Sequence, residues 1–273
     1  MSGLGRRLPT ALGYGAVLLI AAALPWAGPL MWALLAALAY LELARLVRAA
    51  PVGGTLLVLA LWTVHLATPL GPPWALETPG FALVVGALVA LALELSRGDR
   101  RGWPRRAAWT VGGALWTGGL LGYLVGLGEV GSTATAAPAS VPVWLLLALG
   151  VTWAADIAAY AVGSLWGSRK LAPRLSPGKT WEGTLAGFAA AALVAVLCVP
   201  LAGIPALPAL LVALLAGPAA LAGDLAESAL KRSAGVKDSG TLLPGHGGVF
   251  DRIDSLLGVT PVVALAFRLA AGL

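Results

Sequence analysis

Four polar side chains form a stripe on an otherwise apolar stretch of the chain. They are spaced at i, i+3, i+4 and i+7, on one face of an α-helix, and are Asp224, Glu227, Ser228 and Lys231. A carboxylate at the centre of a membrane helix costs about 2.5–3.5 kcal/mol, so Asp224 and Glu227 need a partner or a task. Two interpretations stay open: an internal ladder of two i,i+4 pairs, which lowers that cost, or a binding site.

Cations and carboxylates continue beyond this helix. Lys231, Arg232 and Lys237 can bind phosphates, with arginine as a bidentate donor and lysine as a point charge. Asp251 and Asp254 are i,i+3 at the start of the last helix, where they could simply offset the helix dipole. Carboxylates and cations in one short segment are also what Mg²⁺ and a polyphosphate jointly require.

A glycine-rich turn lies between these charged residues. Glycines 245, 247 and 248 let the backbone approach a ligand closely. His246, flanked by glycines, could donate to a phosphate, act as an acid or be a polar loop residue.

A second group of polar residues precedes the stripe. Ser176 followed by Pro177 predicts a helix N-cap with proline in the first turn, and the free N–H groups of such a helix end bind anions. Lys179 and Thr180 add donors, although capping and ordinary cytoplasmic charge explain the same residues. The spacing of a nucleotide-binding P-loop is absent, so a common kinase site is not supported.

The composition sets the elements that must position these groups. The chain has 273 residues, 59% hydrophobic and only 11% charged, whereas soluble domains carry roughly a quarter charged residues. Apolar runs of membrane-spanning length predict an all-α polytopic membrane protein with about nine spans, near residues 8–26, 28–46, 51–70, 78–95, 107–127, 141–164, 184–204, 206–230 and 255–273. The one cysteine, Cys198, excludes an intrachain disulfide.

The basic residues orient these spans. All but one of the 18 Lys and Arg residues lie in alternate loops, leaving only Arg268, and short cytoplasmic loops collect such residues. This predicts a cytoplasmic N-terminus, an outside C-terminus and cytoplasmic loops at 165–183 and 231–254. Residues 1–140 and 141–273 are expected to form an N-terminal and a catalytic region.

Two further carboxylates lie near the ends of early spans. Glu42 and Glu94 are each followed three residues later by an arginine, Arg45 and Arg97. We expect both to form i,i+3 pairs.

The segment 228–254 reads SALKRSAGVKDSGTLLPGHGGVFDRID. It resembles the signature of the phosphatidate cytidylyltransferases, the CDP-diacylglycerol synthases. The stretch from Asp156 to Gly183 resembles the family's second region, with Gly178 where a lysine is usual, so that one expected phosphate contact lacks its residue. The role of Asp156 stays open.

The resemblance implies transfer of a cytidylyl group from CTP to phosphatidate, giving CDP-diacylglycerol and pyrophosphate. It implies Mg²⁺, with room for a second cation such as K⁺, held by Asp224 and Asp251, with Asp238, Asp254 and Glu227 as further ligands. The catalytic residues would be Asp224, Asp251, Lys231 and Asp238. The substrate-binding residues would be Ser176, Lys179, Thr180, Ser228, Arg232, Lys237, His246, Gly247, Gly248 and Arg252.

The expected location is a bacterial cytoplasmic membrane with the site facing the cytoplasm. CTP, phosphatidate and membrane lipid are the expected partners, nucleic acid is not expected, and a homodimer is left open. A transporter of anionic metabolites would need related halves with charges near mid-bilayer, and we find no such repeat. A CTP-dependent kinase of an isoprenoid alcohol is the nearer alternative, which the match from Lys237 to Asp254 disfavours.

Overall fold

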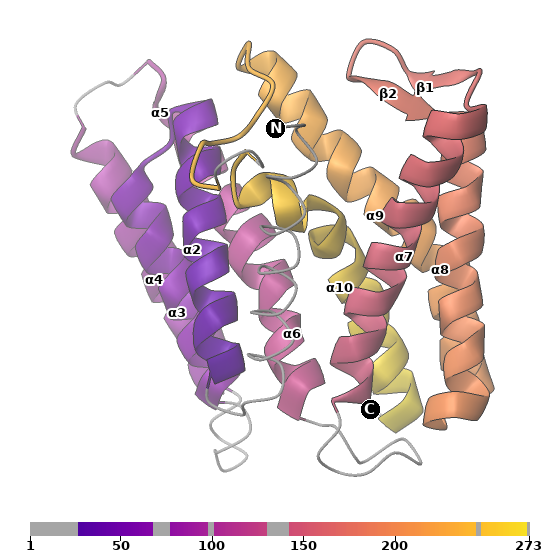
Figure 1. Cartoon of the computed structure of the whole chain (residues 1–273). Coiled ribbons are helices and arrows are strands. Elements are labelled where there is room, and N and C mark those ends of the chain that lie inside the picture. The colour runs from indigo at the N-terminus through magenta and orange to yellow at the C-terminus, as the bar shows by residue number, and fades with distance from the viewer. Residues whose placement is uncertain (1–26, 68–76, 98–100, 130–141, 244–246, 272–273) are drawn as a thin grey trace. The chain divides into compact units, whose positions relative to one another are not determined.

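The computed structural model describes residues 27–67, 77–97, 101–129, 142–243 and 247–271, and nearly all of them are helical (Figure 1). The first expected span, residues 8–26, lies outside the described residues. The chain forms two compact units: unit 1 comprises Met1–Gly126 and Ala234–Arg252, and unit 2 comprises Leu127–Ser233 and Ile253–Leu273. Each unit therefore combines segments that lie far apart in the sequence. The domain boundary expected at residue 140 stays a prediction.

Six described helical stretches are long and apolar enough to cross a membrane, which makes this a polytopic membrane protein. They are Gly28–Val47, Trp103–Gly128, Val143–Trp166, Trp181–Ala202, Ala206–Ser233 and Phe250–Ala271. Pro51–Trp62 and Val84–Leu95 are shorter apolar helices. These stretches overlap eight of the expected ranges, while the count of nine spans and their orientation stay predictions.

Unit 1 is a packed group of helices. Its helical elements are α2 (Ala27–Val47), α3 (Pro51–Ala67), α4 (Glu77–Leu95), α5 (Trp103–Ala114), the π-helical segment η2 (Leu115–Gly119) and the start of α6 (Leu120–Glu129). Helix α3 packs against α2 and α4, and η2 packs against α2 and α3. The core includes the fully buried Trp32 and Tyr40, and the Tyr40 hydroxyl donates to the Ala50 carbonyl at 2.8 Å.

The two early carboxylates have different partners. Glu94, fully buried on α4, accepts from Arg97 at 3.3 Å and from Arg106 of α5, so the expected pair with Arg97 is confirmed. The expectation that Glu42 pairs with Arg45 is wrong: the Glu42 carboxylate accepts from Ser239, Val249 and Phe250. Arg45 is exposed to solvent, whereas these donors are buried together with Glu42.

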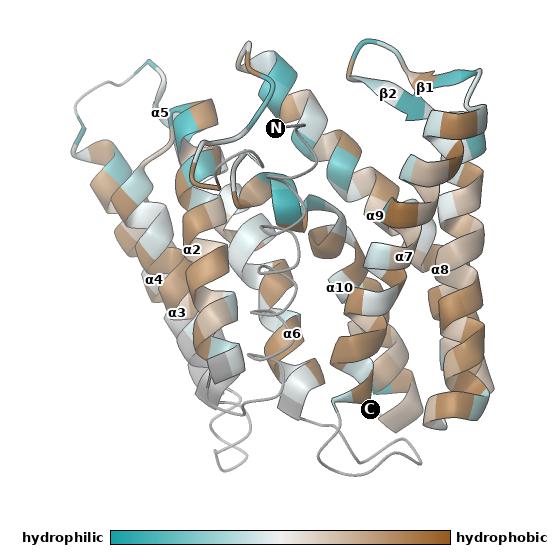
Figure 2. Cartoon of the chain, viewed as in Figure 1, coloured by the Kyte–Doolittle hydropathy of each residue, from teal (hydrophilic) through white to brown (hydrophobic). Residues whose placement is uncertain are grey.

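Unit 2 is built from α7 (Val143–Trp166), α8 (Trp181–Ala202), α9 (Ala206–Ser233) and α10 (Phe250–Ala271) from Ile253 onward. Helix α8 packs against α7 and α9 and is hydrophobic over most of its length (Figure 2). A Cβ at Gly187 would lie 2.8 Å from the Ala155 carbonyl of α7, and one at Gly258 of α10 would meet the Ala219 carbonyl of α9. Small residues thus let these backbones approach, as is common between membrane helices.

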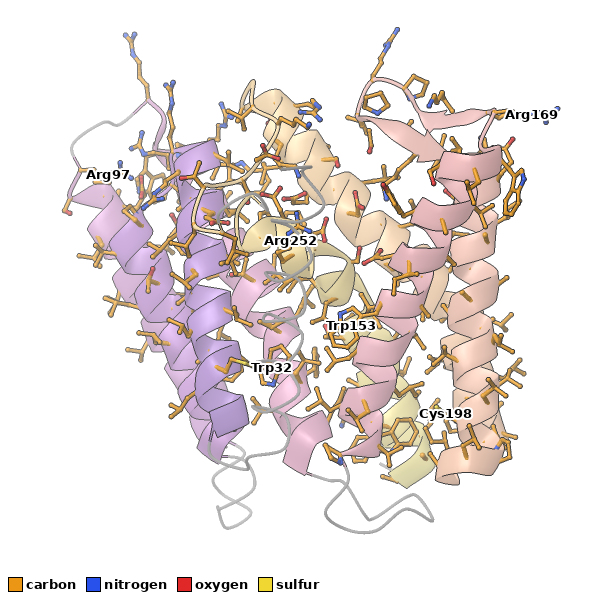
Figure 3. All side chains as sticks on the ribbon, viewed as in Figure 1. Trp32, Arg97, Trp153, Arg169, Cys198 and Arg252 are labelled. Carbon is orange, nitrogen blue, oxygen red and sulfur yellow. The ribbon has the colours of Figure 1, made fainter. Side chains whose placement is uncertain are left out.

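A β-hairpin connects α7 to α8, where only a loop was expected. Strands β1 (Lys170–Ala172) and β2 (Ser176–Thr180) pair antiparallel. The predicted N-cap at Ser176 is wrong, because Ser176 lies in β2 and Thr180 caps α8 by accepting from the Gly183 N–H at 3.2 Å. Each strand of a two-stranded sheet has one open edge. Pro177, which has no backbone N–H to donate, is tolerated on such an edge. Arg169 marks the hairpin end of this unit and Cys198 lies toward the other end of α8 (Figure 3).

Replacing Gly258 tests the close approach of α9 and α10. Gly258→Leu should lower the melting temperature in detergent, because overpacking of this kind costs about 1–3 kcal/mol. The control is Gly126→Leu, since a Cβ at Gly126 has nothing within 4 Å. Equal melting temperatures for the two variants would contradict the packing described here.

Candidate functional site

The polar stripe of α9 contains two contacts within the helix. Ser228 Oγ donates to Asp224 Oδ1 at 3.4 Å, and Lys231 Nζ lies 2.5 Å from Glu227 Oε2. Glu227, Ser228 and Lys231 are all buried. The internal ladder is therefore present, and it lowers the cost of keeping these groups away from water.

The hairpin contacts the same face of α9. Lys179 Nζ lies 2.6 Å from Asp224 Oδ2, with about a quarter of each side chain exposed. Arg232 Nε donates to the Leu175 carbonyl, between the two strands, at 3.2 Å. The two polar regions that the sequence analysis singled out thus contact each other inside unit 2.

Two further carboxylates lie near this contact. Asp254 of α10 interacts electrostatically with Asp224, Asp156 and Lys231. Asp156 comes from α7 and accepts from Ser255 Oγ at 3.3 Å. We call the carboxylates of Asp156, Asp224, Glu227 and Asp254 the acidic cluster. Asp156, whose role the sequence left open, therefore lies close enough to Asp254 to interact with it electrostatically.

The formal charge of this region is negative. Four carboxylates are accompanied by the ammonium groups of Lys179 and Lys231. Carboxylate oxygens are the ligands that Mg²⁺ prefers, so the residue types of the acidic cluster fit this ion. Within the described residues no group of three or more His, Cys, Asp or Glu could hold a metal. Mg²⁺ usually takes one or two carboxylates and completes its shell with substrate phosphates and water.

Asp251 organises the glycine-rich loop of unit 1, by which we mean the described residues 234–243 and 247–249. Its Oδ2 accepts from the N–H of Ser239 at 2.8 Å and from the N–H of Gly248 at 2.8 Å, and it lies 2.9 Å from Ser239 Oγ. Gly247 has a positive φ of 79°, and its carbonyl accepts from the Leu243 N–H at 3.0 Å. Asp251 therefore links the two sides of the loop from the first turn of α10.

The remaining predicted site residues have varied surroundings. Exposed side chains belong to Arg232, Lys237, Asp238 and Arg252. Thr180 is buried in its capping position, and Gly248 is buried in the glycine-rich loop. His246 lies outside the described residues.

The sequence analysis did not assign a site role to two residues that contact predicted site residues or their loop, Ser255 and Glu42. Ser255 holds Asp156, and nothing in a helix-forming apolar run distinguishes one serine. Glu42 had a visible signal, a carboxylate in an apolar span, but a nearby arginine offered a simpler explanation. Its donors lie about 200 positions away in the chain, beyond the reach of any local pattern.

A double-mutant cycle tests the contact between Lys179 and Asp224. Lys179→Met should lower the melting temperature in detergent, because the acidic cluster loses a cation. Adding Asp224→Asn should cost less than the sum of the single changes, by a coupling of about 0.5–1 kcal/mol. Arg174→Met, an exposed change in the same hairpin, serves as the control. Strictly additive effects would show that the pair contributes nothing.

Comparison with known proteins identifies the family of this chain. The family model described as "Cytidylyltransferase family" matches residues 6–270. A protein of Brucella suis biovar 1 named phosphatidate cytidylyltransferase is 40% identical over 194 residues, covering 70% of this chain and 65% of the Brucella protein. Proteins of the same name are 46% identical over 132 residues in Pseudomonas aeruginosa (47% of this chain, 48% of that protein) and 46% over 120 residues in Bacillus subtilis (43% and 45%). The matches span less than two thirds of these relatives' own length. Because the family model covers nearly the whole chain, this protein belongs to the cytidylyltransferase family.

Proposed function

We propose that the protein transfers a cytidylyl group from CTP to phosphatidate, forming CDP-diacylglycerol and pyrophosphate. Family membership and the names of the relatives support this proposal. The observation that carries it is the contact of Lys179 with Asp224, because it brings a cation from the hairpin to the carboxylates of α9. A reaction on a triphosphate needs both kinds of group in one place.

The proposed reaction is an in-line substitution at phosphorus. A phosphate oxygen of phosphatidate forms a bond to the α-phosphorus of CTP, and the bond from that phosphorus to the bridging oxygen of the β-phosphate breaks. Pyrophosphate leaves with the electron pair. Negative charge develops on the oxygens in the transition state, so cations in fixed positions accelerate the step. Lys231 and Lys179 are the proposed cations closest to the acidic cluster.

We propose Mg²⁺ as the cofactor, with Asp224 and Asp251 as its first ligands on the basis of residue type and the family resemblance. Asp238, Asp254 and Glu227 are proposed as further ligands, and K⁺ as a candidate second cation. A bound Mg²⁺ supplies charge that stabilises the oxygens of the reacting phosphates. Ser228 and Lys179 each contact Asp224, so both orient its carboxylate.

The remaining polar residues are proposed to bind the substrates. Arg232, Lys237 and Arg252 are exposed cations suited to the phosphates of CTP and phosphatidate. From the sequence pattern, Ser176, His246, Gly247 and Gly248 complete this group. Thr180 contributes indirectly, because its side chain caps the helix that follows Lys179.

We propose that the site faces the cytoplasm at a bacterial inner membrane. The distribution of Lys and Arg along the sequence supports this orientation. CTP then arrives from water while the acyl chains of phosphatidate stay in lipid. A homodimer remains a proposal from the sequence alone.

A direct assay tests the proposed reaction. Purified protein in detergent, given CTP, phosphatidate and Mg²⁺, should release pyrophosphate and form CDP-lipid in equal amounts. Diacylglycerol should give no product, because it lacks the attacking phosphate. Turnover of an isoprenoid alcohol with no turnover of phosphatidate would replace this proposal by the kinase alternative.

Metal removal and a charge-neutralising variant test the cofactor. EDTA should abolish turnover and added Mg²⁺ should restore it. Asp224→Asn keeps the side chain's shape and should lower kcat by about 100-fold or more, with a higher Mg²⁺ concentration needed for half-maximal rate. Glu94→Gln neutralises a buried carboxylate held by arginines and should leave the Mg²⁺ dependence unchanged. Full activity in EDTA would exclude the metal.

A further inference from the structure

We infer that Glu42 of α2 is a positioning residue, which holds the glycine-rich loop and the first turn of α10 in the geometry that the reaction requires. The expected effect of Glu42 on catalysis rests on the proposed function. Its structural basis lies entirely within unit 1, since Glu42 and residues 234–252 all belong to that unit. Glu42 is 4% exposed, so it acts through the loop and is shielded from solvent.

The Glu42 carboxylate accepts hydrogen bonds from the loop at Ser239 and Val249 and from the first residue of α10. Oε2 accepts from Ser239 Oγ at 2.9 Å and from the Phe250 N–H at 2.9 Å. Oε1 accepts from the Val249 N–H at 3.1 Å. Ser239 and Val249 are ten positions apart in the chain, so a single side chain holds these two positions close together.

These hydrogen bonds also explain how a carboxylate is tolerated in this environment. The first N–H groups of a helix have no partner within the helix, and the N-terminal end carries partial positive charge. Glu42 supplies the acceptor and the negative charge from another helix. A buried charge with well-placed donors is rigid, because moving it would leave both the carboxylate and the N–H groups unpaired.

Two glycines make the close approach possible. A Cβ at Gly240 would meet Glu42 Oε1, and a Cβ at Gly248 would meet Glu42 Oε2 and Ser239 Oγ. Neither position has a positive φ, so the missing side chain and not the backbone conformation is what these sites require. The loop backbone thus lies nearer to Glu42 than any other residue type would allow.

Ser239 is shared between two carboxylates. Its Oγ lies 2.9 Å from Glu42 Oε2 and 2.9 Å from Asp251 Oδ2, yet a hydroxyl has one proton to donate. When Asp251 takes another partner, Ser239 can keep its hydrogen bond to Glu42. The Val249 and Phe250 N–H groups also donate to Glu42, so these two bonds do not depend on which carboxylate receives the Ser239 proton.

An aromatic contact between Phe250 and Trp116 also holds the first turn of α10 in place. Phe250 is fully buried, and its ring lies 5.4 Å from that of Trp116 at an interplanar angle of 82°. Trp116 belongs to the π-helical segment η2, a type of irregularity often found near functional sites. Asp251 and Arg252 directly follow Phe250 in the chain, so whatever fixes Phe250 also sets their positions.

The test compares Glu42→Gln with Glu94→Gln, a matched change of a buried carboxylate in the same unit. In Glu42→Gln an amide NH₂ faces backbone donors, so the loop should be released. Hydrogen–deuterium exchange at Val249 and Phe250 should quicken at least about tenfold, and kcat should fall by about tenfold or more with KM for CTP little changed. Glu94→Gln should alter neither the exchange at these amides nor kcat.

A second pair of variants keeps the inference testable if Glu42→Gln does not fold. Gly240→Ala should release the loop by steric conflict with Glu42, and it should have no added effect in a Glu42→Ala background. Unchanged exchange and kcat in a folded Glu42→Gln protein would overturn the inference. The exchange measurement does not require catalytic activity. If the wild-type protein proves inactive, the proposed function is excluded, and the exchange data still show whether Glu42 holds the loop.

Discussion

A carboxylate that leaves water must find hydrogen-bond donors or cations, and this constraint organises both units of the protein. Glu94 meets two arginines, Glu227 meets Lys231 and Asp224 meets Lys179. Glu42 meets backbone N–H groups and a hydroxyl. Each of these contacts joins two chain segments or two turns of a helix. The polar groups that are costly to bury therefore also fix the positions of loops and helix ends.

The two kinds of compensation have different chemical consequences. Backbone N–H groups are fixed by the fold, so a carboxylate paired with them serves as a rigid anchor. Lysine has a long flexible side chain and can exchange one anionic partner for another, so a carboxylate paired with it stays open to competing ligands. Unit 1 uses the first kind at its glycine-rich loop. Unit 2 uses the second kind in the acidic cluster, which suits the exchange of substrates and ions that we propose there.

Hydropathy predicted the helices well because lipid leaves the backbone few alternatives: the run expected at 184–204 is α8, Trp181–Ala202. Local spacing also offered the ladder of Glu227 with Lys231 as one of two interpretations, and the structure contains it. The hairpin was missed, since Ser176 and Thr180 both suit an N-cap and only pairing with Lys170–Ala172 decides between them. Glu42 was misassigned because its partners are distant in sequence. Of the predicted site, the structure brings Lys179 and Ser228 to Asp224. It also brings Lys231 to Glu227 and Gly248 to Asp251.

The discontinuous make-up of unit 1 has a consequence for synthesis of the protein. Glu42 and the Val249 amide that it accepts from are separated by 207 positions. At about 5–20 residues per second, a ribosome needs on the order of 10–40 s to deliver that amide after α2 has emerged. During this interval the nascent α2 carries a carboxylate without its eventual donors. Helix α2 can therefore reach its final packing only after the chain has been synthesised as far as Phe250.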